Sequence, residues 1–339
     1  MTIEITTRSR LSQRVQDVPP SGIRKFFDVL ATMPDVISLG VGEPDFDTPA
    51  GIKQAGIDAL LAGRTQYTSN YGTLELREAL SAHLERRYDV RYDPAREMLI
   101  TVGGSEALAI AMQAVVDPGD EVVLAEPSYV AYVPDVIFSG GEAVYVATSP
   151  EDGWQLDPDA VEAAISPRTK VLFLGYPCNP TGAVLEPEVR RQLADIALRH
   201  DLIVISDEVY DRLVYGGHRH EAFSSLPGMR ERTILLGGFS KSYAMTGWRV
   251  GYACAPADLL EGMLKIHQYI IMSAPTMSQD AAVHALLTAD DEVERMRVEY
   301  DRRRAMFVAG LERMGLPTVE PRGAFYAFPD ITRSGLSSA

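Results

Sequence analysis

Cysteine is scarce in this chain of 339 residues, which contains only Cys178 and Cys254. Two cysteines cannot build the framework of several disulfides that stabilises small secreted domains. Their number fits a reducing compartment, and we therefore expect a cytoplasmic location. The six histidines do not show the spacing of metal ligands, so the sequence predicts no metal site.

Long apolar runs and an excess of basic residues are absent as well. No segment approaches the roughly 20 apolar residues that a membrane-spanning helix needs. The first residues, MTIEITTRSRLSQRVQDVPP, lack the apolar centre of a signal peptide. Against 32 lysines and arginines stand 47 aspartates and glutamates, a formal net charge of −15, which argues against a nucleic-acid partner. We predict a protein that binds neither membranes nor nucleic acids.

Strand-like and helix-like segments alternate along residues 48–256. Short apolar runs predict strands, and amphipathic stretches between them predict helices, one of which, TLELREALSAHLERRY, has Thr73 at its N-cap. Such alternation is typical of an α/β domain with a largely parallel sheet. The predicted strands are MLITV, EVVLAEP, EAVYVAT, KVLFLGYP, LIVISDEVY, TILLGGFS and RVGYACAP.

The two ends of the chain differ from this middle part. Residues 1–47 look like an amino-terminal arm with one short apolar piece, GIRKFFDVLATM. Residues 257–339 are mostly helical, with a long stretch DEVERMRVEYDRRRAMFVAGLERMG. Because a chain of this length rarely builds a single core, we expect a large domain over 48–256 and a smaller α+β subdomain. That subdomain is predicted to combine residues 257–339 with the amino-terminal arm.

Polar residues follow several predicted strands at the points where the strands end. Asn179 follows KVLFLGYP, Asp207 and Tyr210 follow LIVIS, and Lys241 follows TILLGGFS. In an open α/β sheet the carboxyl ends of the strands border one crevice, so we expect these side chains to meet there. The stretch GGFSKSYAMTGWRVGY has no structural need for a lysine, which points to a function for Lys241.

The same crevice is predicted to bind an anion. The stretch VGGSEA joins a strand to a helix at Gly104 and Ser105. Small residues at the N-terminus of a helix leave backbone N–H groups free for an anion. Arg249 can add a bidentate contact to the same anion.

Together these groups match the needs of pyridoxal phosphate. That cofactor requires an amine for a Schiff base, an acid for its ring nitrogen, and donors for its phosphate and its ring oxygen. Tyr129, in EPSYVAY, offers a flat face for the ring. The residues predicted to supply the four groups are, in that order, Lys241, Asp207, Gly104 with Arg249, and Asn179 with Tyr210.

Each of these residues also has an ordinary structural interpretation when it is taken alone. A lysine such as Lys241 is usually solvated, an aspartate after a strand often belongs only to a loop, and paired glycines usually make turns. Tyr129 and Tyr67 can be half-buried aromatics. It is the conjunction of all these residues at one predicted crevice that favours a cofactor site.

The chain resembles the class I/II, fold-type I aminotransferases that use pyridoxal phosphate, in particular the bacterial aspartate aminotransferase-like members. SGIRKFF, LKIHQY and APTMSQ are most similar to members of the N-acetyl-diaminopimelate aminotransferase type. The resemblance runs from about Leu11 to the end. It implies a large domain with a mostly parallel, seven-stranded sheet flanked by helices, a smaller α+β subdomain, and a homodimer with shared sites. The motifs are GEPDFDTP, YTSNYGTLELREAL, VGGSEAL, NPTG, SDEVY, SKSYAMTGWRVGY and GAFYAFP.

The resemblance also implies roles for the matching residues. Lys241 forms the Schiff base with the cofactor and shuttles the substrate proton, while Asp207 keeps the ring nitrogen protonated and Tyr210 acts with them. Tyr67 reaches the phosphate bound by the neighbouring subunit, and the Asn179–Pro180 bond is often cis in the family. The other cofactor-binding residues implied are Gly104, Ser105, Glu106, Tyr129, Asn179, Ser240 and Arg249, and the substrate-binding residues are Gly42, Tyr129 and Asn179.

The sequence departs from the family pattern at positions that bear on the substrate and the phosphate. Relatives continue past FPDITRSGLSSA and carry there the arginine that binds the substrate α-carboxylate, for which this sequence has no match. Cofactor binding is expected to survive this, and turnover to suffer. Ser105 stands where some aspartate-specific relatives have a lysine, which argues against a strict aspartate preference. Gly238 replaces a phosphate-binding serine, for which Ser240 is expected to compensate.

We therefore predict an aminotransferase (EC 2.6.1.-) that moves an amino group from an L-amino acid to a 2-oxo acid by a ping-pong mechanism. Glutamate and 2-oxoglutarate are the expected second pair. Two alternatives stay open. A β-lyase on the same fold would release pyruvate or ammonia. A catalytically weak, cofactor-binding protein with an interaction or regulatory role is suggested by the unmatched arginine.

Overall fold

The computed structural model describes residues 10–20, 39–40 and 42–335. The apolar piece GIRKFFDVLATM, expected to form part of the amino-terminal arm, lies outside the described residues. Among the described residues, no helix is long and apolar enough to cross a membrane.

A seven-stranded sheet forms the centre of the fold, in the order β1-β7-β6-β5-β4-β2-β3. Neighbouring strands from β6 to β3 run parallel, whereas β7 pairs antiparallel with both β1 and β6. All seven predicted strands are present, so the prediction of a mostly parallel sheet is confirmed. The strands are β1 (Met98–Thr101), β2 (Glu121–Glu126), β3 (Glu142–Ala147), β4 (Thr169–Gly175), β5 (Ile203–Asp207), β6 (Thr233–Gly238) and β7 (Gly251–Cys254).

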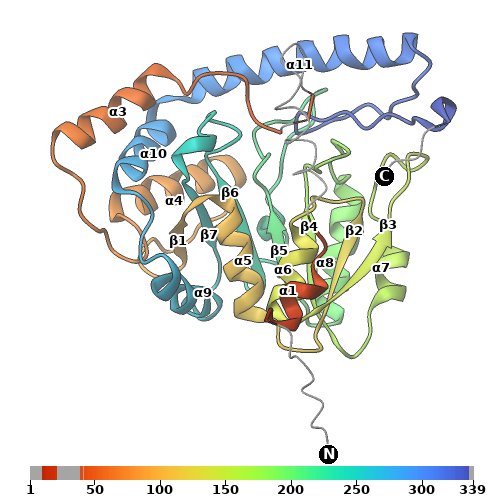
Figure 1. The fold of residues 1–339 in the computed structure, drawn as a ribbon, viewed down its shortest axis with the longest axis horizontal. Helices are drawn as coiled ribbons and strands as arrows, with labels where there is room; N and C mark the ends of the chain where they lie inside the picture. Colours follow the sequence, from red (N-terminus) through yellow and green to blue (C-terminus); the bar gives the residue numbers. More distant parts are fainter. Residues whose placement is uncertain (1–9, 21–38, 41, 336–339) are drawn as a thin grey trace, which may run out of the picture.

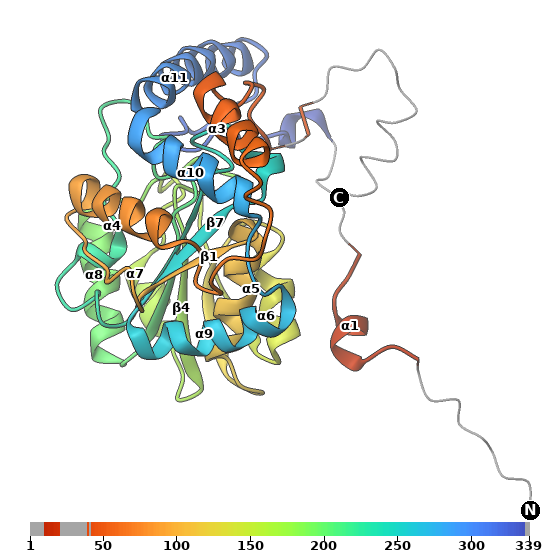
Figure 2. The ribbon, with the colours of Figure 1, turned by 90° about the vertical axis from the view of Figure 1, so that its left-hand side faces the viewer.

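Helices cover both faces of this sheet, as Figures 1 and 2 show. On one face, α5 (Gly103–Val115), α6 (Tyr132–Ser139) and α9 (Ala257–Ile270) share a buried apolar cluster with the strands. On the other face, α7 (Pro158–Ala164) and α8 (Pro187–Arg199) form a second cluster. Apolar strands pack on both faces in this way because parallel sheets are buried between two helical layers.

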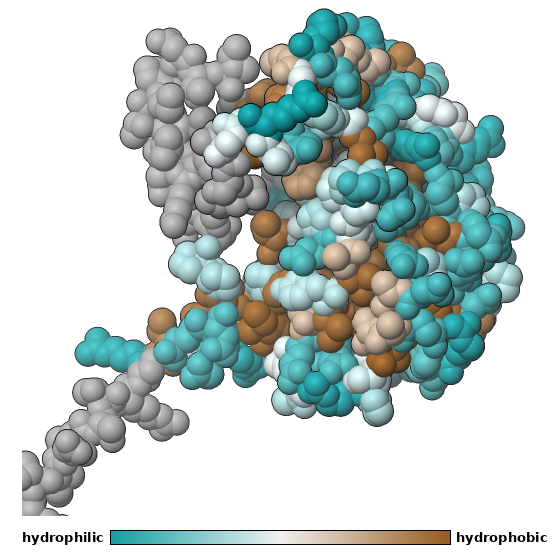
Figure 3. Space-filling view, turned by 90° about the vertical axis from the view of Figure 1, so that its right-hand side faces the viewer, coloured by the Kyte–Doolittle hydropathy of each residue, from teal (hydrophilic) through white to brown (hydrophobic). Residues whose placement is uncertain are grey.

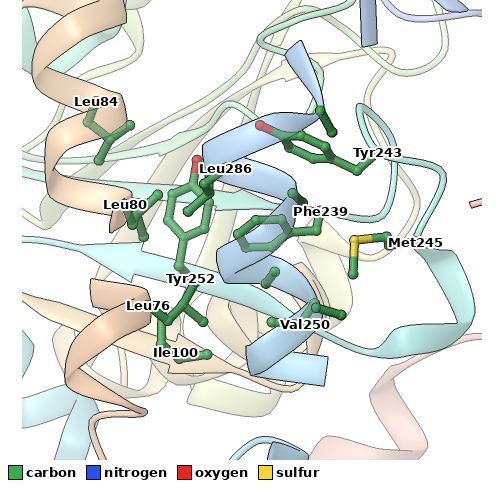
Figure 4. Packing of buried hydrophobic residues seen from close by; sticks show 14 of the residues in the cluster. Leu76, Leu80, Leu84, Ile100, Phe239, Tyr243, Met245, Val250, Tyr252 and Leu286 are labelled. Carbon is green, nitrogen blue, oxygen red and sulfur yellow. The ribbon is translucent and has the colours of Figure 1, made fainter. Parts of the chain in front are cut away.

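A third buried apolar cluster lies at the end of the sheet that contains the antiparallel strand β7. It joins α4 (Leu74–Tyr88) and α10 (Thr276–Thr288) to the strands β1, β6 and β7. Figure 4 shows Leu76, Leu80 and Leu84 of α4 directed toward Tyr252. These leucines recur every four residues, and each fully buried side chain contributes roughly 1.5–3 kcal/mol.

The helix predicted from TLELREALSAHLERRY is α4, and Thr73 is its N-cap residue. The expected side-chain cap is not made, because the Thr73 hydroxyl is buried without a hydrogen-bond partner. Instead, the backbone N–H of Thr73 donates to Oε1 of Gln279 on α10, at 2.7 Å. A side chain of α10 thus accepts from the N-cap residue itself and joins the start of α4 to α10.

Helices dominate the chain beyond residue 256, as expected. The long helix α11 (Asp290–Arg313) crosses the top of the molecule in Figure 1, and residues 314–335 fold back beneath it in this view. The face in Figure 3 is largely hydrophilic, with hydrophobic residues in separate groups. The remaining helices are α1 (Gln13–Asp17), α3 (Ala50–Leu61), η1 (Phe223–Ser225), η2 (Thr246–Trp248) and η3 (Thr332–Ser334).

Candidate active site

A cavity of about 530 Å³ opens at the carboxyl ends of the parallel strands. Strands β4, β5 and β6 end beside it, and the first turn of α5 borders it. Ten of the predicted site residues line it together, which the topology of the sheet explains. They are Gly42, Gly104, Ser105, Tyr129, Asn179, Asp207, Tyr210, Ser240, Lys241 and Arg249.

Lys241 lies in the loop after β6 and extends its amine into the cavity. Its Nζ donates a hydrogen bond to the backbone carbonyl oxygen of Gly42 and lies 5.9 Å from the centre of the Tyr210 ring. Burial lowers the pKa of Lys241 below its ordinary value; Glu43 and Asp207 oppose this effect, and the nearby charge of Arg249 adds to it. A lysine with a lowered pKa is more often in the neutral form that can attack a carbonyl carbon.

Asp207 is the last residue of β5 and lines the cavity. The backbone N–H of Val209 donates to its Oδ1 at 3.2 Å, and the hydroxyl of Tyr132 donates to its Oδ2 at 3.0 Å. Burial raises the pKa of Asp207, against the lowering effect of these two donors. A protonated ring nitrogen beside this carboxylate would relieve the cost of burial, because opposite charges stabilise one another where water is excluded.

One part of the cavity wall is formed by the N-terminus of α5 and by Arg249. Gly103 begins the helix with φ +75°, and a Cβ there would overlap the guanidinium of Arg249. The guanidinium donates to two carbonyl oxygens, that of Thr246 at 3.0 Å and that of Val102 at 3.4 Å. Among the described residues no carboxylate forms a salt bridge with Arg249, so its charge is available to an anion beside Gly104.

A close backbone approach holds this helix N-terminus in place. A Cβ at Gly251, the first residue of β7, would lie 2.5 Å from the carbonyl carbon of Gly103 and 2.6 Å from the nitrogen of Gly104. Only glycine therefore lets the start of α5 approach the sheet so closely. The local sequence RVGY thus helps to place the backbone N–H groups at the start of α5.

Three polar side chains that line the cavity meet one another. The hydroxyls of Tyr210 and Tyr326 lie 2.6 Å apart, and Nδ2 of Asn179 donates to the Tyr326 oxygen at 3.3 Å. The Asn179–Pro180 peptide bond is cis, as the resemblance implied. Burial raises the pKa of Tyr210 well above its usual value, so this phenol stays protonated and can donate a hydrogen bond.

Two of the predicted site residues do not reach the cavity. Oε2 of Glu106 accepts from the backbone N–H of Val102 at 2.5 Å, and its Oε1 lies 2.6 Å from Nδ1 of His267 on α9. Glu106 therefore faces α9 and the first turn of its own helix. Tyr67 lies at the surface with 81% of its area exposed, and it does not line this cavity.

The sequence analysis did not single out two tyrosines that contact the site. Tyr132 follows Tyr129 by three residues, which is one helical turn, and this spacing was the available signal. Its ring packs edge-to-face with that of Tyr129, with the ring centres 5.5 Å apart. Tyr326 lies in the motif GAFYAFP, whose likeness was noted without a role for its tyrosine.

These residues fit pyridoxal phosphate by their chemistry. An amine of lowered pKa, a buried carboxylate, a helix N-terminus with an arginine, and phenol and amide donors all face one cavity. The exposed ring of Tyr129 offers a wall against which a flat ring can pack.

Comparison with known proteins identifies the family. A model of the family described as aminotransferase class I and II matches residues 34–338. The chain is 46% identical to the aspartate aminotransferase of Pyrococcus abyssi and 44% identical to aromatic-amino-acid aminotransferase 2 of Thermococcus litoralis, and each match covers 97% of this chain and 85% of the relative. The structure of N-succinyldiaminopimelate aminotransferase from Mycobacterium tuberculosis is similar with a TM-score of 0.93 at 37% identity, over 96% of this chain and 85% of that chain. The chain therefore belongs to the class I and II aminotransferases, the family of enzymes that uses pyridoxal phosphate.

Proposed function

We propose that this enzyme binds pyridoxal phosphate and transfers the amino group of an L-amino acid to a 2-oxo acid by a ping-pong mechanism. The observation that carries the proposal is the placement of Lys241 and Asp207 in one cavity, with an arginine-flanked helix N-terminus at its edge. When bound, the cofactor supplies an electron sink for the carbanion that forms at the substrate α-carbon.

Lys241 would link the cofactor and move the α-proton. Its lowered pKa favours the neutral amine, which is both a nucleophile and a base near neutral pH. Its Nζ donates to the Gly42 carbonyl, and among the described residues no carboxylate forms a salt bridge with it. Asp207 would bind the protonated ring nitrogen, with its position set by Tyr132 and Val209.

The phosphate would be held by the backbone N–H groups at Gly104 and Ser105, by the hydroxyl of Ser240 and by Arg249. All four residues line the cavity. Asn179 and Tyr210 would donate to the ring oxygen, and Tyr129 would cover the ring face. Gly42 and Asn179 are the residues we assign to the substrate carboxylate side.

Glutamate and 2-oxoglutarate are proposed as one substrate pair, and the other pair is left to experiment. Relatives named for aspartate, aromatic amino acids and N-succinyldiaminopimelate are all similar to this chain. Ser105 supplies a hydroxyl and not a cation at the cavity wall. The lack of a cation at this position argues against a strict preference for aspartate as the substrate.

We further propose a cytoplasmic homodimer in which Tyr67 contributes to the partner's site. Tyr67 and Tyr269 are 81% and 87% exposed, and the Gln66 carbonyl beside Tyr67 accepts from Thr276 at the start of α10. Large exposed aromatic side chains favour a protein interface. The two cysteines are free and buried, which suits a reducing compartment.

Absorbance spectroscopy with added pyridoxal phosphate tests the proposal. The wild-type protein should develop the visible band of a lysine-bound cofactor, Lys241→Ala should lack it, and Lys265→Ala should retain it because Lys265 lies exposed on α9 with a salt bridge to Glu261. Amino donors are then added one at a time, and the true donor should abolish the band with release of its 2-oxo acid. Release of ammonia, or of pyruvate from a donor other than alanine, would show a lyase instead, and a band that no donor discharges would show a protein that only binds the cofactor.

Mixed dimers test the shared site. Lys241→Ala and Tyr67→Ala are each expected to be weak alone. A hybrid of the two contains one site with Lys241 from one subunit and Tyr67 from the other. Refolding an equal mixture should restore roughly a quarter of the wild-type activity if the dimer is symmetric. No recovery, together with a sedimentation mass of one chain, would exclude the shared site.

A further inference from the structure

The segment Arg322–Ala324, which follows α11, is bonded to two loops of the candidate site. The N–H groups of Arg322 and Gly323 both donate to the carbonyl oxygen of Gly182, at 2.9 and 2.8 Å. The N–H of Tyr215 donates to the carbonyl of Arg322, and the N–H of Ala324 donates to that of Leu213, both at 2.9 Å. One short segment thus connects the loop after β4, which carries Asn179, to the loop after β5, which carries Tyr210.

Tight packing fixes the position of this segment. A Cβ at Gly323 would lie 2.5 Å from Cβ of Pro177, and a Cβ at Gly182, whose φ is +72°, would overlap Pro321. The two glycines permit the backbones to touch, and the four backbone hydrogen bonds then set the register between them. The segment is therefore positioned by the same loops whose side chains face the cofactor cavity.

Tyr326, two residues further on, makes the corresponding contacts with its side chain. Its hydroxyl lies 2.6 Å from that of Tyr210 and accepts from Nδ2 of Asn179 at 3.3 Å. A Cβ at Gly42 would overlap this hydroxyl, so the chain beside Gly42 closes the third side. Tyr326 thus contacts three of the elements that we assign to the cofactor and the substrate.

The direction of the hydrogen bonds follows from counting protons. The amide nitrogen of Asn179 can only donate, so the Tyr326 oxygen is the acceptor in that pair. The single proton of Tyr326 is then free to be donated to the Tyr210 oxygen. This leaves the proton of Tyr210 directed elsewhere, and the cavity is the open side. Hydrogen bonds in such a chain polarise and strengthen one another.

We propose that Tyr326 is a positioning residue that orients the hydroxyl of Tyr210 so that it donates its proton to the ring oxygen of the cofactor. The proposal rests on the proposed function, because it assumes that pyridoxal phosphate occupies the cavity. A donor to the ring oxygen stabilises the negative charge on that oxygen. It therefore lowers the pH at which the lysine-bound cofactor loses its proton.

The test is a spectrophotometric pH titration of the bound cofactor in Tyr326→Phe. The ring and its edge-to-face contact with Tyr210, at 5.8 Å between ring centres, are retained, and only the hydroxyl is lost. The midpoint of the absorbance transition should rise by about 0.5–1 pH unit, the equivalent of one typical net hydrogen bond. In a Tyr210→Phe background, Tyr326→Phe should shift it much less, because most of its effect passes through Tyr210.

Tyr300→Phe is the matched control. Tyr300 packs against Phe325 with ring centres 5.5 Å apart, and its hydroxyl is buried without a hydrogen-bond partner. In the described part of the chain the Tyr300 hydroxyl forms no hydrogen bond with Tyr210 or Asn179. Loss of this hydroxyl should therefore leave the midpoint unchanged.

The outcomes separate this inference from the proposed function. A wild-type protein without the cofactor band overturns the proposed function, and the inference with it. A normal band and an unshifted midpoint in Tyr326→Phe overturn the inference alone. Circular dichroism checks the fold of each variant. If Tyr326→Phe fails to fold, Tyr326→Leu serves as the second variant, and an unshifted midpoint there overturns the inference equally.

Discussion

The hydroxyl of Tyr132 on α6 donates to Oδ2 of Asp207 at the end of β5, across 3.0 Å. Tyr132 is buried, so the bond is shielded from water, and it is one of two hydrogen bonds found for the Asp207 carboxylate. A helix on one face of the sheet thus orients a carboxylate at the sheet edge. This relationship makes Tyr132 the first residue whose change we would examine.

Tyr132→Phe should weaken pyridoxal phosphate binding by about 10-fold or somewhat more, the equivalent of a hydrogen bond to a charged group. The lost donor raises the pKa of Asp207 further, so the carboxylate is less often ionised beside the ring nitrogen. Equilibrium dialysis of the cofactor measures the effect. Tyr145→Phe, at an exposed position on β3, should bind as wild type does, and an equal loss in both variants would contradict the assignment.

Gly103→Ala should lower the free energy of unfolding by about 1–2 kcal/mol, because an L-residue at this positive φ is strained. The substitution should also weaken binding of the cofactor, since the new Cβ displaces Arg249. Chemical denaturation measures the first effect. Gly104→Ala is the control for stability alone, because a Cβ there meets nothing within 4 Å. Equal unfolding of the two variants would show that the strain at Gly103 is absent.

Ionisation of Asp135 should lower the free energy of unfolding as the pH rises from about 4 to 6. Burial raises its pKa to about 6, whereas the unfolded value lies near 4. In this window the folded state binds the extra proton, so its advantage is present at low pH and is lost as the carboxylate ionises. Asp135→Asn should therefore be more stable than wild type at pH 7, by on the order of 1 kcal/mol after solvent screening, and equal to it near pH 4. Urea unfolding at both pH values decides this.

The pair Glu208 and His220 should be strongly coupled. Nε2 of His220 lies 2.7 Å from Oε2 of Glu208, with side-chain exposures of 10% and 4%. Leaving one member of a buried ion pair unpaired typically costs about 3–5 kcal/mol, so His220→Gln should destabilise by up to that amount. The double variant Glu208→Gln with His220→Gln should lose less than the sum of the two single variants. Strict additivity in this cycle would show that the pair is not an interacting unit.

The same pair predicts a pH dependence with a defined sign. Burial lowers the pKa of His220, but the charge and the hydrogen bond of Glu208 outweigh it, and the net pKa is raised. The folded state therefore holds a proton that the unfolded chain releases near pH 6.5. This stabilisation is complete below that pH and is lost as the pH rises through the folded pKa. The ring signals of His220 in NMR spectra should titrate above the ordinary histidine range, and a lower midpoint would contradict the prediction.

Much of the fold was predictable because its elements have strong local patterns. The strand TILLGGFS is apolar along its length because β6 is buried in the middle of the sheet, and the same holds for KVLFLGYP in β4. The order of the strands was not predictable in this way. The antiparallel pairing of β7 with β1 depends on contacts between residues more than 100 positions apart, such as Met98 with Cys254.

The candidate site was predictable where it depends on strand ends and not where it depends on helix rotation. Asp207, Asn179 and Lys241 were assigned to one crevice because parallel strands end at the same edge. Glu106 was expected beside them because the resemblance, through the motif VGGSEAL, implied a cofactor-binding role for it. The turn of α5 instead carries its side chain toward His267, and nothing in the local sequence announces this contact.

The sequence by itself determined the seven strands, the helices between them and the set of polar residues at the strand ends. Burial on both faces of the sheet leaves a local apolar pattern, and parallel strands end at the same edge whatever their order. Only the tertiary structure decided that Tyr132 supports Asp207 and that Tyr326 joins Tyr210 and Asn179. Tyr326 lies 116 residues from Tyr210 in the chain. Side chains so far apart meet only through the packing of whole elements, which hydrophobic periodicity does not encode.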